Sequence, residues 1–147
     1  MGGNNFNGKS RGNAVEVNRT PIELTDENYV SQAEAVIKRL IDENGKNKIL
    51  TTSKIRKLLA MISEMYTKAK RLKSNTLNSD LLTKLQYFKM HTVYEAGRES
   101  SVKKFVEEAQ ITNQIDKIKT DREKLILFCH YMEALVAYRK FLGGRDE

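Results

Sequence analysis

The chain has 147 residues, of which 39% are hydrophobic and 31% are charged, a composition that suits one small domain and not a disordered or membrane protein. It has no apolar run near the ~18 residues of a membrane-spanning helix, no apolar N-terminal stretch typical of a signal peptide, and a single cysteine, so an internal disulfide is excluded and a cytoplasmic location is expected. The net charge of +7 favours a polyanionic partner, and nucleic acid is the first candidate.

Residues 1–24 are rich in Gly and Asn, show no hydrophobic periodicity and are predicted to form a disordered N-terminal arm. Residues 25–147 are predicted to form a single helical domain. The first helix of this domain should begin at Thr25, whose hydroxyl can cap the N-terminus and is followed by acidic residues in the first turn. Asn44 and Gly45 should end it, because both residue types tolerate the left-handed conformation that helix ends often need.

The second predicted helix is strongly basic. One of three consecutive hydroxyl residues, Thr51, Thr52 or Ser53, should cap its N-terminus. Its apolar positions recur on one helical face and are Ile55, Leu58, Leu59, Ile62, Met65, Tyr66, Ala69 and Leu72. Its basic residues are Lys54, Arg56, Lys57, Lys68, Lys70, Arg71 and Lys73. With Glu64 as the one acidic residue among these seven basic ones, the helix has a net charge of +6 and accounts for most of the excess charge of the chain.

The outer face of the basic helix is predicted to contact phosphates. Four basic residues are expected opposite the apolar face, namely Arg56, Lys57, Lys68 and Arg71. A solvated surface helix usually mixes both signs in i, i+4 pairs, whereas here only Glu64 and Lys68 form such a pair. Three lysines flank the face, Lys48, Lys54 and Lys73, and a second candidate contact is Arg98. Because no arginine–aromatic cluster suggests a base-stacking platform, these cations are predicted to hold phosphates and not to read bases.

Three further helices complete the prediction. The third should begin near Asn78 and run to Ala96, with Gly97 as a candidate break. The fourth should begin at Ser100 or Ser101 and end at Ala109, and residues 111–118 continue its apolar pattern less regularly. No segment alternates with period two for long enough to predict a strand, so the predicted fold is all-α, a five-helix bundle.

The fifth helix should start at a capping box, in which Thr120 and Glu123 exchange side-chain and backbone hydrogen bonds. Its expected buried stripe consists of Leu125, Phe128, Cys129, Met132, Val136 and Phe141. Gly143 and Gly144 should end it.

No catalytic or metal site is predicted. His91 and His130 lie on different predicted helices without a nearby cysteine, so neither belongs to a zinc motif. The chain also has no glycine-rich phosphate loop, and no Ser or Cys nucleophile has an evident base partner. We therefore expect a protein that is not an enzyme and that binds no cofactor.

Three segments, taken together, resemble a known family. They are LTTSKIRK (Leu50–Lys57), YEAGR (Tyr94–Arg98) and EALVAYRK (Glu133–Lys140). Their order and spacing in a five-helix context are similar to those of the small subunit of the type III-A CRISPR effector, the Csm complex. The resemblance covers residues 24–144.

The resemblance implies a five-helix bundle whose copies stack in a minor filament beside the backbone subunits that hold the guide RNA. The implied role is that of a non-catalytic subunit in antiviral defence, lining the channel for guide RNA and target RNA. Cleavage of target RNA would belong to the backbone subunit, and DNA cleavage and cyclic oligonucleotide synthesis to the large subunit. The implied partners are these subunits, both RNAs and copies of the chain itself, without a membrane.

Two other functions fit the residues. In the first, Asn44–Leu59 forms the turn and recognition helix of a DNA-binding helix-turn-helix, although the long following helix and long loop argue against it. In the second, the chain is a helical adaptor whose basic face meets an acidic protein. Treatment with RNase separates these functions, because only an RNA-bound complex should lose its nucleic acid.

Overall fold

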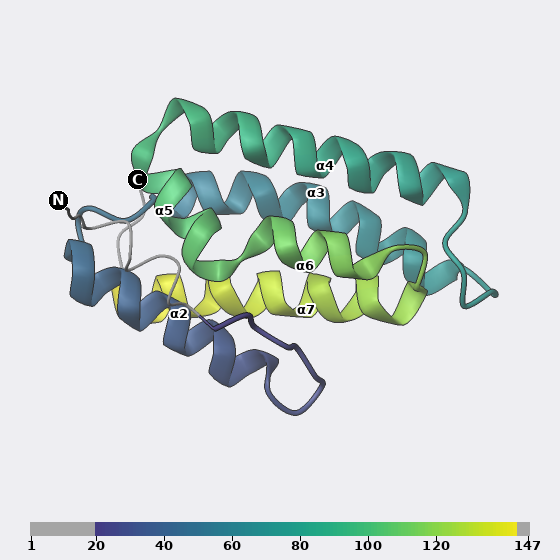
Figure 1. The fold of residues 1–147 in the computed structure, drawn as a ribbon, viewed down its shortest axis with the longest axis horizontal. Coiled ribbons are helices and arrows are strands. Elements are labelled where there is room, and N and C mark those ends of the chain that lie inside the picture. Colours follow the sequence, from purple (N-terminus) through teal and green to yellow (C-terminus); the bar gives the residue numbers. More distant parts are fainter. Residues whose placement is uncertain (1–19, 144–147) are drawn as a thin grey trace, which may run out of the picture.

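The structure is a computed structural model that describes residues 20–143. The helices of this part of the chain are α2 (Tyr29–Asn44), α3 (Thr52–Arg71), α4 (Ser79–Arg98), α5 (Ser100–Ala109), α6 (Ile111–Ile118) and α7 (Arg122–Tyr138), followed by the short π-helix η1 (Arg139–Gly143). Figure 1 shows α3, α4 and α7 running along the long axis of the molecule, with α2 crossing obliquely beside α7. The prediction of an all-α fold is confirmed for the described residues, whose one β pairing is an isolated bridge between Thr76 and Asp121.

The predicted number of helices is wrong, because residues 20–143 alone form six α-helices and not five. Residues 111–118, expected to be less regular, form the separate helix α6 and bury Ile111, Ile115 and Ile118. The break falls at Gln110, which adopts a left-handed conformation with φ 57° and ψ 43°. Gly97, the candidate break, lies inside α4 as its penultimate residue.

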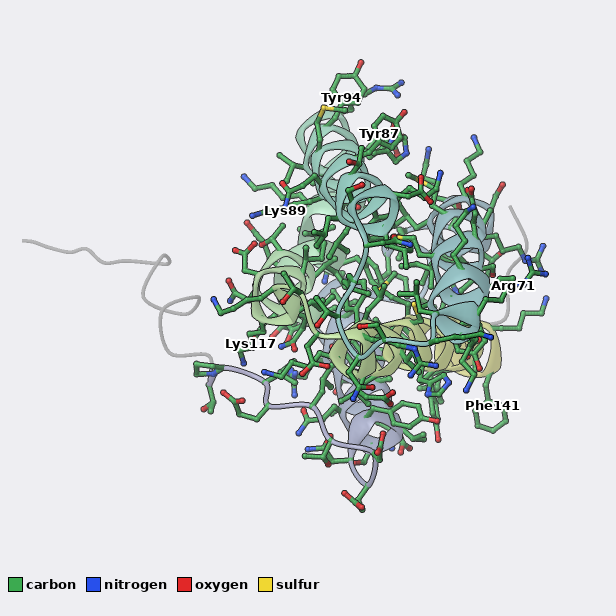
Figure 2. All side chains as sticks on the ribbon, turned by 90° about the vertical axis from the view of Figure 1, so that its right-hand side faces the viewer. Arg71, Tyr87, Lys89, Tyr94, Lys117 and Phe141 are labelled. Atoms are coloured by element: carbon green, nitrogen blue, oxygen red, sulfur yellow. The ribbon has the colours of Figure 1, made fainter. Side chains whose placement is uncertain are left out.

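Helix α7 forms the centre of the core. It packs against α2, α3 and α6, and its side chains at Leu125, Phe128, Cys129 and Met132 are buried as predicted. Phe141 was expected to extend this stripe, but it is 80% exposed. The α-helix ends at Tyr138, and in η1 the changed turn carries Phe141 out toward solvent (Figure 2).

The turn η1 also buries a charged side chain. Arg139 is 2% exposed, and its Nε donates a 2.7 Å hydrogen bond to the backbone carbonyl oxygen of Leu50. Leu50 directly precedes Thr51, the N-cap of α3, so the end of the described chain is tied to the start of the basic helix.

The predicted helix ends are confirmed in part. Helix α2 ends at Asn44 with Gly45 at a positive φ, as expected. It begins at Tyr29 and not at Thr25, and the Thr25 hydroxyl accepts from the backbone N–H of Asn28 in the turn that precedes it. The capping box at Thr120 is wrong by one residue, because Asp121 is the N-cap of α7.

Most of the predicted N-terminal arm, residues 1–19, lies outside the described residues. Its last part, residues 20–24, packs against the α5–α6 junction. Ile22 is 5% exposed, its backbone N–H donates to Gln110 at 2.8 Å, and its carbonyl oxygen accepts a 2.8 Å bond from Gln114. No helix within residues 20–143 is long and apolar enough to cross a membrane.

Candidate nucleic-acid interface

A groove between α3 and α4 brings together residues that are far apart in the sequence. The two helices run antiparallel, since Lys54 at the start of α3 forms an ion pair with Glu99, and Lys68 near its end lies 3.7 Å from Asp80 at the start of α4. One hollow of about 250 Å³ is lined by Leu50, Lys54, Lys57, Leu58, His91, Glu95, Arg98 and Val102. A second, of about 540 Å³, is lined by Met61, Glu64, Met65, Thr83, Lys84, Tyr87 and His91. His91 borders both hollows, and we call them together the α3/α4 groove.

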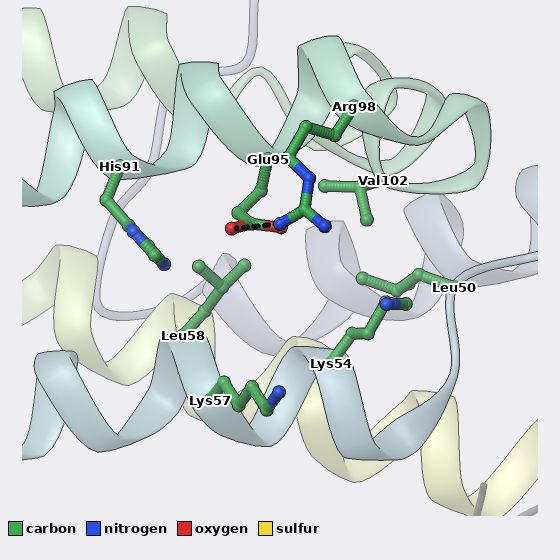
Figure 3. Close-up of a pocket in the computed structure, with 8 residues that line it drawn as sticks. All are labelled: Leu50, Lys54, Lys57, Leu58, His91, Glu95, Arg98 and Val102. Carbon is green, nitrogen blue, oxygen red and sulfur yellow. Dashed lines mark hydrogen bonds and ion pairs between the residues drawn. The ribbon is translucent and has the colours of Figure 1, made fainter.

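The first hollow unites the two predicted contact regions. Figure 3 shows Lys54 and Lys57 on α3 opposite His91 and Arg98 on α4. Arg98 also donates to the carboxylate of Glu95 at 3.3 Å. The basic helix and Arg98, predicted as separate candidates, therefore belong to one site.

The remaining predicted residues are distributed around α3. Lys57, Arg56 and Arg71 are exposed, as are Lys48 and Lys73 beyond the ends of the helix. Arg56 and Lys57 are successive helical residues and so point about 100° apart. Lys57 lines the groove, whereas Arg56 does not. The predicted face is therefore wider than one stripe, and its groove edge includes Lys54, Lys57, Met61 and Glu64, which recur every three or four residues.

The ion pairs along the groove differ from the predicted pair. Glu64 was expected to pair with Lys68, but it lies 3.2 Å from Lys84, and Lys68 pairs with Asp80. Acids on α4 and just after it thus offset part of the positive charge of α3. Within residues 20–143, no acidic partner lies within ion-pair distance of Lys57, Arg71 or Lys73, so these cations are available to an external anion.

The sequence prediction included Arg98 but missed the other planar side chains of α4. Tyr87, His91, Tyr94 and Arg98 recur at intervals of four, three and four residues, and this helical spacing was the available signal. The rings of Tyr87 and His91 lie 6.3 Å apart with an interplanar angle of 18°, and the Arg98 guanidinium lies 5.7 Å from the centre of the Tyr94 ring. An arginine–aromatic pair, which the sequence prediction did not find, therefore lies on α4.

Two other titratable groups, His130 and Cys129, lie on α7 outside the groove. The ring of His130 contacts the rings of Tyr29 and Tyr66, at centroid distances of 5.7 and 5.4 Å. Burial, with a smaller effect of Glu133, raises the pKa of the Cys129 thiol to about 12, so the thiol stays protonated at neutral pH. Within residues 20–143, no group of three or more His, Cys, Asp or Glu residues could hold a metal ion.

Known proteins match the chain over the whole helical region. A profile of the Csm2 Type III-A family matches residues 25–145. The chain belongs to the Csm2 Type III-A family. Among its relatives is the CRISPR system Cms protein Csm2 of Streptococcus thermophilus, 50% identical over 123 residues, which are 84% of this chain and 98% of the relative. The protein of the same name from Enterococcus italicus is 38% identical over 131 residues, 84% of this chain and 94% of the relative.

A more distant member of the family, also named CRISPR system Cms protein Csm2, comes from Mycobacterium tuberculosis. It is 36% identical over 124 residues, which cover 84% of this chain and 98% of the relative. The resemblance to the small subunit of the type III-A effector, inferred from three short segments, is thereby confirmed. Two of these segments supply residues of the α3/α4 groove, namely Lys54 and Lys57 from the first and Glu95 and Arg98 from the second.

Proposed function

We propose that this Csm2 family member is a non-catalytic subunit that contacts the phosphate backbone of guide and target RNA through the exposed cations along and just beyond α3 and the α3/α4 groove beside them. In this proposal it works in the cytoplasm, its copies stack in a filament, and the filament lies beside the backbone and large subunits. The observation that carries the RNA contact is the row of exposed cations along α3. Lys57, Arg71 and Lys73 have no acidic partner within residues 20–143, in a chain of net charge +7.

Helix geometry supports a backbone contact. Lys57 and Arg71 are fourteen residues apart on α3, and at 1.5 Å per residue this separates them by about 21 Å along the helix axis. Long flexible side chains at that spacing can reach several successive phosphates of one strand. Such contacts position the nucleic acid without reading its sequence. We therefore expect RNA binding to depend strongly on salt and weakly on sequence.

The two alternatives receive less support. Helix α2 packs against α5 and α7, and residues 45–51 separate it from α3, so the pair does not have the short turn of a helix-turn-helix. A basic face that met an acidic protein would keep its partner after RNase treatment. The family's name in CRISPR systems favours RNA.

The test compares two pairs of substitutions that remove the same charge. The first variant carries Lys57→Gln and Arg71→Gln, on α3. The control carries Lys119→Gln and Lys124→Gln, which line a different hollow with Leu24 and Ile118. Affinity for RNA would be measured at several salt concentrations, with helicity checked by circular dichroism.

We expect the α3 variant to bind RNA more weakly regardless of RNA sequence. Each lost phosphate contact should flatten the log–log salt dependence by about 0.7 for a single strand. The control should retain more of its affinity and slope, because its lysines do not lie on α3. Equal losses in both variants would mean that only net charge matters, and an unchanged α3 variant would remove this face from the interface.

A further inference from the structure

One edge of α4 carries a line of planar side chains. Tyr87, His91, Tyr94 and Arg98 lie at i, i+4, i+7 and i+11, which places them on one side of the helix. Tyr87 is 55% exposed and Tyr94 is 62% exposed, and Figure 2 shows both pointing away from the body of the molecule. We call these four residues the α4 ledge.

The ledge borders the cationic groove. Tyr87, His91 and Arg98 all line it. His91 and Arg98 lie opposite Lys54 and Lys57 of α3 (Figure 3), whereas Tyr87 shares its hollow with Met61 and Glu64 of α3. Proteins that bind single-stranded nucleic acids combine these two features, a positive groove for the backbone and aromatic faces on which bases stack. An arginine plane adds to such a platform, because guanidinium groups also stack on rings.

We propose that the α4 ledge is a stacking platform for unpaired bases of single-stranded RNA. The phosphates of the strand lie toward Lys57 and the other cations of α3, and its bases lie against the rings of Tyr87 and Tyr94. This inference rests on the proposed RNA contact and extends it, since it assigns a binding role to the bases as well as to the phosphates.

The spacing of the ledge selects a single strand over a duplex. Successive members are three or four residues apart, which is about 4.5–6 Å along the helix axis. Bases of one strand in a duplex are ~3.4 Å apart and already stacked on each other. A duplex therefore offers no free base face to the tyrosines, whereas an extended single strand can place separate bases on separate rings.

The position of the ledge favours RNA over a protein partner. Met90 and Val93 are also exposed on α4, at 59% and 52%, and an apolar protein surface could cover them. Three of the four ledge residues, Tyr87, His91 and Arg98, however, line the groove, and Arg98 holds a charge that an apolar partner would have to desolvate. A protein partner is thus the outcome that the experiment must be able to detect.

The experiment uses the full chain and three probes of equal length. These are an unstructured single-stranded RNA of about twelve nucleotides, the same RNA paired with its complement, and a ribose-phosphate chain that lacks bases. The variants are Tyr87→Leu and Tyr94→Leu, which remove the ring and keep a good helix former. Tyr87→Phe and Tyr94→Phe keep the ring, and Met90→Ala changes an exposed neighbour that is not part of the ledge.

We expect the wild-type chain to bind the single strand more tightly than the baseless chain. Each Tyr→Leu change should weaken single-strand binding about 5-fold or more, the low end of the effect of one stacked base. Binding of the baseless chain and the salt slope should not change, because no phosphate contact is lost. Both Phe variants and Met90→Ala should bind like the wild type.

Two results would overturn the stacking platform: the single strand and the baseless chain bind equally well, or the Tyr→Leu variants keep full affinity for the single strand. If variants that keep this affinity also lose association with the other subunits when the complex is assembled, the ledge is a protein interface. A failure of the proposed phosphate contact can be told apart from these results, because it would be seen in the salt slope of the variant that carries Lys57→Gln and Arg71→Gln.

Discussion

Two glycines illustrate how backbone conformation decides the effect of a methyl group. Gly45 follows the last residue of α2 with φ 87° and ψ 153°, a region that is nearly restricted to glycine. Gly97 lies inside α4, where any L-residue is allowed. A Cβ at either position would meet no atom within 4 Å, so packing does not distinguish them.

We predict opposite effects of alanine at these two positions. Gly45→Ala should lower the free energy of unfolding by roughly 1–3 kcal/mol, because the residue is held in a disfavoured conformation. Gly97→Ala should raise it by about 0.5–1 kcal/mol, because glycine in a helix costs conformational entropy. Urea denaturation of both variants measures this difference. Destabilisation by Gly97→Ala would indicate that its backbone is not helical in solution.

At the scale of an element, the start of α7 depends on one carboxylate. Oδ1 of Asp121 accepts hydrogen bonds from the backbone N–H groups of Glu123 and Lys124, at 2.9 and 3.2 Å. Asp121→Ala should therefore cost about 0.5–2 kcal/mol of stability. Thr120→Ala should stay within about 0.5 kcal/mol, as an ordinary surface change does. If both variants lost the same stability in thermal denaturation, the result would support the predicted capping box at Thr120.

The elements that the sequence predicts well are those determined by local spacing. The apolar repeats of α3 and α7 and the glycine after α2 depend on neighbouring residues alone. The break between α5 and α6 does not, because the side chain of Gln110 is bonded to the backbone of Thr20 and Ile22, about ninety positions away, at 2.9 and 2.8 Å. The left-handed conformation of Gln110 therefore coincides with tertiary contacts, and no glycine or proline marks a turn at this position in the sequence.

The residues of the candidate site were likewise predictable only where local sequence features determine them. The basic residues of α3 and Arg98 could be found from charge and spacing. Their partners could not, because Glu99 and Asp80 lie across the groove from Lys54 and Lys68 and reach them only after α3 and α4 pack together. The α4 ledge has a helical spacing that sequence inspection could have found, had its tyrosines been considered as a set.

At the scale of the whole molecule, net charge and exposed apolar surface have opposite effects on self-association. Copies of net charge +7 repel, while exposed apolar side chains occur on α4 and at Phe141, on different sides of the molecule in Figure 2. Two distinct patches suit head-to-tail stacking more than a closed dimer.

We predict weak, concentration-dependent self-association that strengthens with salt. Added salt screens the repulsion between copies and leaves apolar contacts in place. Sedimentation velocity over a range of concentrations, at low and high salt, would measure it. A large oligomer that is independent of concentration, or one that dissociates as salt is added, would contradict this account.

The bond between Arg139 and Leu50 has a consequence for protein synthesis. It joins residues 89 positions apart, and α7, the last of the described helices to leave the ribosome, also supplies the surface on which α2 and α3 pack. The start of the basic helix is therefore anchored only when nearly all of the described chain has been translated. A nascent chain would present its lysines without the opposing wall of an ordered groove, so the surface that we propose to bind RNA matures at the end of translation and not during it.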